Sequence, residues 1–308
     1  MRPLPSLALC LGLSSVVGSA LPQQPAEPPI LSVRTDLVTL PVTVVDRHGV
    51  LVTGLGPEHF TVYDNGERQT IQFFTNEDLP ATIGLVLDSS GSMRGRREEV
   101  TAAGTAFVAI SHPLGEFFTI NFNEAVWPGL PPDVLFTEDR RQLGAALSAA
   151  PARGMTALYD AVDRALEHLQ RGSRDRKALI VISDGGDNAS SQTLETVLEH
   201  ARRTNALIYS VTIFDPDNRD ARPQVLKALA RETGGQAFAP GRAEEITRSF
   251  AQIAREIRSG YTIGFVPDDS SGDGFRSIRV VADAGNDRQL VVRTRAGYYA
   301  GPPGRTAR

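Results

Sequence analysis

The chain has 308 residues, a formal net charge of −4 and 41% hydrophobic residues. At about 150 residues per domain, that length suggests two structural units with packed cores. The acidic balance argues against nucleic acid as a partner, since proteins that bind a polyanion normally show a basic excess or a basic stripe. We therefore expect a globular protein that binds no nucleic acid.

Residues 1–20 have the pattern of a secretory signal peptide: an arginine, an apolar stretch and small residues before a cleavage point. The only cysteine of the chain, Cys10, lies inside this segment, so the processed protein has no cysteine for a disulfide. Residues 21–29 contain four prolines and are interpreted as a linker. No later segment reaches the ~20 apolar residues of a membrane span. We expect an exported protein, periplasmic or extracellular, with no transmembrane segment in the mature chain.

Residues 30–79 show a two-residue hydrophobic period, which is typical of half-buried strands. The alternating residues are Val38, Leu40, Val42 and Val44. Asp64-Asn65-Gly66 is a hairpin signal, and we expect it to join strands over 60–63 and 70–73. The segment predicts the first part of a small β domain.

Between residues 80 and 259, short apolar runs alternate with amphipathic helical patterns. This alternation predicts a parallel sheet with helices on both faces. The expected strands cover residues 82–87, 117–122, 178–183, 206–214 and 236–239.

Residues 260–300 return to the two-residue period, with expected strands over 261–266, 277–282 and 289–294 and a turn at 285–287 between the last two. Neither β segment has enough strands to be stable alone. Because the two ends of a domain often lie close together, we expect both segments to form one small β-sandwich around the inserted α/β domain. Residues 301–308 are expected to be a flexible tail. The predicted fold class is a Rossmann-like, doubly wound, mainly parallel sheet inserted in this composite sandwich.

Oxygen-bearing side chains follow two of the expected strands. The strand over 82–87 ends in Asp88-Ser89-Ser90-Gly91-Ser92, and the strand over 178–183 is followed directly by Asp184. Thr156 opens a helical pattern between them. Ligands of open α/β sheets bind outside the carboxyl ends of the strands, so these oxygens are expected to gather at one edge. The candidate metal ligands are Asp88, Ser90, Ser92, Thr156 and Asp184.

Two carboxylates and three hydroxyls are the hard oxygen ligands that a small divalent cation takes. We expect Mg²⁺ or Mn²⁺, and Ca²⁺ less so, because Ca²⁺ prefers longer bonds and more ligands. For the pentapeptide alone, a polar turn after a strand is the alternative interpretation. Asp187 and Asn188 could extend the rim of the site or orient its ligands, but turn composition favours solvated turn residues. Whether Asn121 and Asn123 support the site or only end a strand stays open.

The five positions resemble the metal-ion-dependent adhesion site (MIDAS) of von Willebrand factor A (VWA) domains, with its Asp-x-Ser-x-Ser pattern, distant Thr and distant Asp. The flanking segments 44–49, 60–66 and 295–299 are similar to those of a bacterial VWFA-related family that is common in acidobacterial genomes. The resemblance implies an adhesion-type binding protein that is not an enzyme. It also implies that an acidic residue of a protein partner completes the coordination of the metal.

Signals for an enzyme are weak. The five histidines form no His-x-x-x-His pair, no Gly-x-Ser-x-Gly elbow surrounds Ser90 or Ser92, and no Gly-Lys-Ser/Thr loop occurs. Phosphotransferases with an aspartate nucleophile usually carry a second Asp two positions on, where this chain has Ser90. We expect no catalytic residue and no cofactor besides the metal. Two alternatives stay open: a metal-dependent hydrolase or phosphatase on the same type of sheet, and a structural module of an envelope complex whose metal only stabilises loops.

Overall fold

The computed structural model describes residues 37–148, 152–213, 221–267, 274–285 and 289–300. The expected signal peptide, linker and C-terminal tail lie outside the described residues. Within the described part, the chain forms three β-sheets and six α-helices.

The central sheet has six strands in the order β10-β9-β8-β5-β6-β7, and all neighbours are parallel except β6 and β7. Its strands are β5 (Ala81–Asp88), β6 (Glu116–Phe122), β7 (Val126–Pro128), β8 (Arg176–Ser183), β9 (Ala206–Thr212) and β10 (Ala237–Phe238). Every residue of β5 and β6 is buried, as expected for parallel strands that are covered on both faces.

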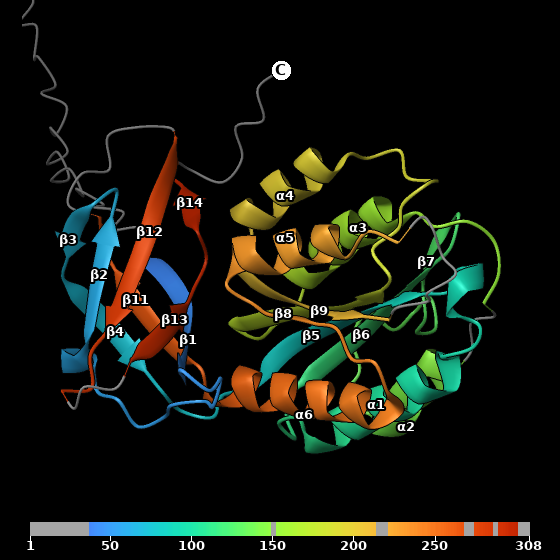
Figure 1. Ribbon diagram of the computed structural model, residues 1–308, viewed down its shortest axis with the longest axis horizontal. Coiled ribbons are helices and arrows are strands. Elements are labelled where there is room, and N and C mark those ends of the chain that lie inside the picture. Colours follow the sequence, from blue (N-terminus) through green and yellow to red (C-terminus); the bar gives the residue numbers. More distant parts are fainter. Residues whose placement is uncertain (1–36, 149–151, 214–220, 268–273, 286–288, 301–308) are drawn as a thin grey trace, which may run out of the picture. The chain divides into compact units, whose positions relative to one another are not determined.

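Helices cover both faces of this sheet (Figure 1). The helices are α1 (Arg97–Ile110), α2 (Arg140–Ser148), α3 (Leu158–Gln170), α4 (Leu194–Arg203), α5 (Pro223–Thr233) and α6 (Ala243–Ser259). One apolar core joins α1, α2 and α6 to the sheet, and a second joins α3, α4 and α5 to the opposite face. The predicted doubly wound, mainly parallel sheet is therefore confirmed.

The two remaining sheets are antiparallel, and each combines strands from both ends of the chain (Figure 1). The first has the order β13-β1-β11-β4, and the second has the order β14-β12-β2-β3. Their strands are β1 (Val38–Asp46), β2 (Phe60–Asp64), β3 (Glu67–Gln69), β4 (Ile71–Thr75), β11 (Tyr261–Phe265), β12 (Phe275–Ala282), β13 (Leu290–Arg293) and β14 (Gly297–Tyr299). A third apolar core, which includes Leu40, Val62 and Ile263, joins the two sheets, so the predicted composite sandwich is also confirmed.

Two details of the expected strand pairing are wrong. The turn at Asn65 and Gly66 is present, with positive φ at both residues, but it joins β2 to β3 instead of to β4. A two-residue turn pairs its immediate neighbours, and β4 then crosses to the first sheet, where it pairs with β11. Strands β12 and β13 also lie in different sheets, because β14 and β2 already occupy both edges of β12. Residues 286–287 of the expected turn lie outside the described part.

Side chains of the last strands reach the α/β domain. Arg293 of β13 forms an ion pair with Glu256 of α6 at 2.7 Å, and only 1% of the Glu256 side chain is exposed. Arg295, itself buried, donates to the Arg202 carbonyl at the end of α4. Among the described residues, no helix combines the length and apolar character that a membrane span requires.

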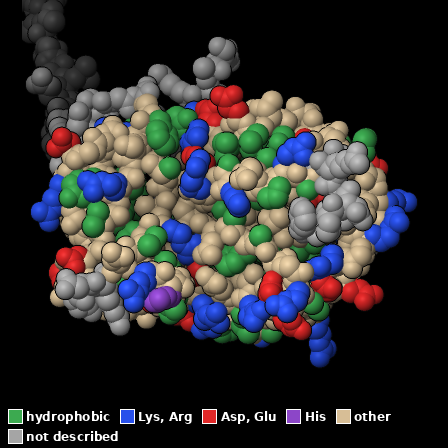
Figure 2. Space-filling view, in the orientation of Figure 1, with side chains coloured by type: hydrophobic (Ala, Val, Ile, Leu, Met, Phe, Trp, Pro, Cys, Tyr) green, Lys and Arg blue, Asp and Glu red, His purple; other side chains and the backbone are tan. Residues whose placement is uncertain are grey.

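Charged side chains are spread over the surface on the side of the molecule that Figure 2 shows. Lys and Arg do not gather in a single stripe on that side, and acidic side chains lie among them. This mixed pattern is typical of a solvated protein surface and gives no footprint of a polyanion site on that side.

Candidate metal centre

The predicted ligands lie at the carboxyl ends of two neighbouring strands and at the start of a helix. Asp88 is the last residue of β5, Asp184 directly follows β8, and these strands pair in parallel up to Leu87 and Ile182. Thr156 lies two residues before α3. Backbone hydrogen bonds tie these loops together, from Gly91 N to the Gly154 carbonyl at 3.2 Å and from Arg153 N to the Ser89 carbonyl at 2.8 Å.

The ligand set is largely buried. Asp88 is 2% exposed, Asp184 and Ser90 are each 1% exposed, and Thr156 is 9% exposed, whereas Ser92 is half-buried. The Ser90 and Ser92 hydroxyl oxygens are 3.1 Å apart. Ser92 lies in a short 3-10 helix, Gly91–Met93, that begins directly after Ser90, and this turn brings the two hydroxyls together.

Both oxygens of the Asp88 carboxylate accept a hydrogen bond. Oδ1 accepts from the Ser90 backbone N–H at 2.8 Å, and Oδ2 accepts from the Ser183 hydroxyl at 2.6 Å. Burial raises the pKa of Asp88 to about 6 although these bonds lower it, and the nearby negative charge of Asp184 raises it further. Among the described residues, no salt bridge reaches Asp88.

The loop of Thr156 is held by backbone hydrogen bonds on both sides. Thr156 N donates to Asn188 Oδ1 at 2.9 Å, and the Thr156 carbonyl accepts from the backbone N–H of Asn188 at 2.9 Å. Ala157 N donates to the Asn123 carbonyl at 2.7 Å, and Met155 N donates to a carboxylate oxygen of Glu124 at 3.0 Å. These contacts fix the backbone that presents the threonine hydroxyl.

The secondary candidates from the sequence have different roles. Asn188 was expected to be a solvated turn residue; it is exposed, but its carboxamide holds the Thr156 backbone, so that interpretation was incomplete. Asp187 accepts from the Ser190 hydroxyl at 2.5 Å and from Tyr159 N at 3.3 Å, so it also ties its turn to the start of α3. Asn123 supports the site, because its side-chain N–H donates to the Arg153 carbonyl at 3.2 Å. Asn121 is buried beside Gly129, away from these bonds.

Sequence reasoning missed two residues that shape the site, Ser183 and Glu124. A polar residue that closes an apolar strand next to Asp184 was the available signal for Ser183. Glu124 carried no such signal, because it lies in a turn whose proximity to Met155 depends on the tertiary fold.

The donor set fits a divalent cation. The buried Asp88 carboxylate has no cationic partner among the described residues, and burying a charge without a counter-charge is costly. Two neighbouring hydroxyls and a second carboxylate supply further hard oxygens of the kind that Mg²⁺ takes. In the part of the chain that the structure describes, no cluster of three or more His, Cys, Asp or Glu residues could hold a metal. The predicted set is not of that kind, since it has only two carboxylates.

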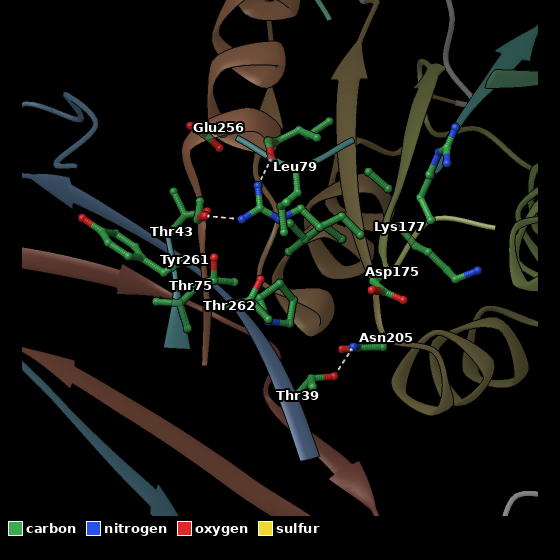
Figure 3. Close-up of a pocket in the computed structure, with 18 of the residues that line it drawn as sticks. Thr39, Thr43, Thr75, Leu79, Asp175, Lys177, Asn205, Glu256, Tyr261 and Thr262 are labelled. Atoms are coloured by element: carbon green, nitrogen blue, oxygen red, sulfur yellow. Dashed lines mark hydrogen bonds between the residues drawn. The ribbon is translucent and has the colours of Figure 1, made fainter. Parts of the chain in front are cut away.

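A cavity of about 510 Å³ lies at the other end of the parallel strands, where β8 and β9 begin and β1 and β11 pass nearby (Figure 3). The three cationic side chains among the described residues that line it already have partners. Arg174 pairs with Glu138, Arg176 donates to the Ile257, Arg258 and Gly260 carbonyls, and Lys177 donates to the Leu169 and Gly172 carbonyls. Asn205 donates to Thr39 across this cavity at 2.7 Å (Figure 3). Arg176 and Lys177 therefore cap the ends of α6 and α3, respectively.

Comparison with known proteins places the α/β domain. The family described as von Willebrand factor type A domain matches residues 81–238. The chain belongs to the von Willebrand factor type A family. No curated protein matches the sequence.

Several solved structures share the fold of this chain at low sequence identity. A von Willebrand factor type A protein from Catenulispora acidiphila aligns with a TM-score of 0.52 and 13% identity over 86% of this chain and 73% of that one. The vWF domain of the type V pili tip protein Mfa5 from Porphyromonas gingivalis aligns with a TM-score of 0.50 and 13% identity over 58% of this chain and 95% of that one. Proximal thread matrix protein 1 from the mussel byssus aligns with a TM-score of 0.50 and 13% identity over 68% of this chain and 51% of that one. These likenesses show the VWA fold.

Proposed function

We propose that this VWA protein is a binding module that holds Mg²⁺ or Mn²⁺ at the carboxyl edge of its parallel sheet and engages a protein partner there. The observation that carries the proposal is the buried Asp88 carboxylate, which has no ion pair among the described residues and lies beside the paired hydroxyls of Ser90 and Ser92. A bound cation would compensate this buried charge.

Each ligand has a distinct part in the proposed site. Asp88 and Asp184 would supply negative charge, and Ser90, Ser92 and Thr156 would supply neutral oxygens that leave the cation incompletely neutralised. When bound, the cation would offer an electrophilic position to a carboxylate oxygen of the partner, from a Glu or Asp side chain. The chain's own residues hold this geometry through the bonds to Ser90 N, Ser183 and the Thr156 backbone.

The proposal covers the setting as well as the site. We propose an exported protein, periplasmic or extracellular, with no catalytic residues, that makes adhesion-type contacts. The pilus tip protein of Porphyromonas gingivalis carries a domain of the same fold, which supports a role at a surface.

Calorimetric titration of the purified protein with MgCl₂ or MnCl₂ tests the metal site. We expect one divalent cation per chain in the wild type, and no measurable binding in Asp88→Ala or Asp184→Ala. Asp175→Ala is the matched control, because Asp175 is exposed and precedes β8 at the opposite end of the strand. Unchanged binding in both site variants would refute the assignment.

The role of the cation in partner binding needs a separate experiment. Proteins captured from envelope extracts with Mg²⁺ should be released by chelator and should fail to bind Asp88→Ala. The acidic residues of a captured partner are then replaced one at a time. We expect one of these replacements to abolish binding of the partner to this protein. Capture that survives both chelator and every acidic replacement would instead favour a purely structural metal.

A further inference from the structure

We infer that Ser183 is a positioning residue for the metal centre: its hydroxyl fixes the Asp88 carboxylate and the turn that carries Asp184. The inference rests on the proposed metal-binding function and assigns a residue outside the Asp-x-Ser-x-Ser, Thr and Asp positions.

The Ser183 hydroxyl lies between the two carboxylate-bearing segments. Ser183 is the last residue of β8 and is 0% exposed. Its Oγ donates to Asp88 Oδ2 at 2.6 Å and accepts from Gly185 N at 3.1 Å. One side chain therefore contacts the carboxylate at the end of β5 and the backbone on the far side of Asp184.

The direction of these bonds is fixed by chemistry. A backbone N–H can only donate, so Gly185 N uses a lone pair of the hydroxyl and leaves its single proton for Asp88. The other carboxylate oxygen accepts from Ser90 N at 2.8 Å. Asp88 is thus held at both oxygens, by two different segments of the chain.

The turn after Ser183 has little freedom to adapt. Gly185 has φ of +84°, and a Cβ at this position would lie 2.4 Å from the Arg222 carbonyl oxygen. Since the site around Ser183 is fully buried, water cannot readily replace a lost hydroxyl, and a carboxylate oxygen would be left unsatisfied. Residues that orient metal ligands in this way typically change metal affinity by about 10- to 100-fold when they are removed.

The pair Ser183→Thr and Ser183→Val isolates the hydroxyl, because the two new side chains have nearly the same shape and only threonine keeps the donor. We expect the Mn²⁺ affinity of Ser183→Thr to lie within about twofold of the wild-type affinity, because threonine keeps the hydroxyl donor. Ser183→Val should bind Mn²⁺ at least about tenfold more weakly than Ser183→Thr. Calorimetry gives both affinities, and unfolding in chelator shows that both variants are folded.

Thr212→Val is the matched control, because Thr212 is a buried hydroxyl that pairs with Ser183 on the adjacent strand. We expect it to leave Mn²⁺ affinity unchanged. If Ser183→Thr and Ser183→Val bind Mn²⁺ with equal affinity while Asp88→Ala binds none, the role of Ser183 is overturned. The assignment of the metal site would then still stand. Absence of Mn²⁺ and Mg²⁺ binding in the wild type would overturn the proposed function, and the role of Ser183 with it.

Discussion

At the scale of single residues, the burial of the Asp88 carboxylate has an energetic cost. Its carboxylate is 2% exposed, and burial raises its pKa to about 6. The folded protein therefore retains a proton between about pH 4 and pH 6 that the unfolded chain has already lost. Ionisation of Asp88 consequently lowers the free energy of unfolding as the pH rises through this window, by up to about 3 kcal/mol.

Asp88→Asn should stabilise the metal-free protein, because the amide has the shape of the carboxylate without its charge. In chelator at pH 7.5, we expect its free energy of unfolding to exceed that of the wild type by about 1–3 kcal/mol. The difference should shrink as the pH falls towards 5, where Asp88 of the wild type is protonated. Urea unfolding across this pH range measures the effect, with Mg²⁺ added in a parallel series. A wild type that is the more stable of the two in chelator at pH 7.5 would contradict this account.

Residue-scale prediction from the sequence was uneven for a physical reason. Asp88 and Asp184 follow apolar runs, so strand periodicity alone predicts which edge they occupy. Asn188 and Glu124 act on the loop of Thr156 through contacts between segments that are 31 or 32 residues apart. Such contacts depend on loop conformation, for which the local sequence has no periodic signal.

At the scale of elements, β5 depends on a residue without a side chain. Gly84 lies in the middle of this fully buried strand, and a Cβ there would lie 2.3 Å from the Phe118 ring and 2.6 Å from a methyl group of Leu179. Phe118 and Leu179 belong to the two strands that flank β5 and to the core under α3. The glycine therefore allows the neighbouring large side chains to close over the strand.

Gly84→Val should destabilise the α/β domain, because the added atoms overlap buried atoms on both neighbouring strands. We expect a loss of about 1–3 kcal/mol or more in the free energy of unfolding. Gly144→Val in α2 is the comparison, since a Cβ at Gly144 meets nothing within 4 Å and only helix propensity changes. Thermal and urea unfolding in chelator measure both variants. If Gly84→Val proves no more destabilising than Gly144→Val, the described packing around β5 is wrong.

Strands and helices were predicted correctly from the sequence where the apolar run or periodic segment was long. The five predicted strands of the parallel sheet differ from the observed ones by one or two residues at most ends, because continuous apolar runs mark strands that are buried on both faces. Strands β3, β7 and β14 have three residues each, too few to show a period. The strand that follows the Asn65 turn was also predicted wrongly. The turn indicates that the next segment pairs with β2, but it does not indicate that this segment, β3, ends at Gln69.

At the scale of the whole molecule, a buried ion pair connects the sandwich to the last helix of the α/β domain. Arg293 and Glu256 are 2.7 Å apart, with 18% and 1% of their side chains exposed. Arg293 also donates to Gln236, which precedes β10. Because breaking a buried pair leaves one charge uncompensated, this contact is more sensitive to mutation than a surface ion pair.

Arg293→Met should lower the free energy of unfolding by about 3–5 kcal/mol, since it leaves Glu256 charged and buried. Adding Glu256→Gln to this variant should recover part of the loss. Arg242→Met is the control, because Arg242 is 75% exposed in its ion pair with Glu245 and should cost about 1 kcal/mol or less. Equilibrium unfolding of the four proteins provides the comparison. Equal losses in Arg293→Met and Arg242→Met would show that the pair does not connect the two parts.

The shared sheets of the sandwich also constrain the order of folding. Pairing of β1 with β13 joins residues near opposite ends of the described chain, and the Thr294 hydroxyl donates to the Pro41 carbonyl across 253 positions. During synthesis, β1 has no strand to pair with until β11 and β13 have left the ribosome. The strands and helices of the α/β domain, which lie between β1 and β11 in the sequence, can already pack by then. Contacts of such long sequence separation form slowly, because the intervening chain must first close a large loop. The sandwich should therefore be the last part to gain protection in a refolding experiment, and an interrupted chain would expose the apolar face of β1.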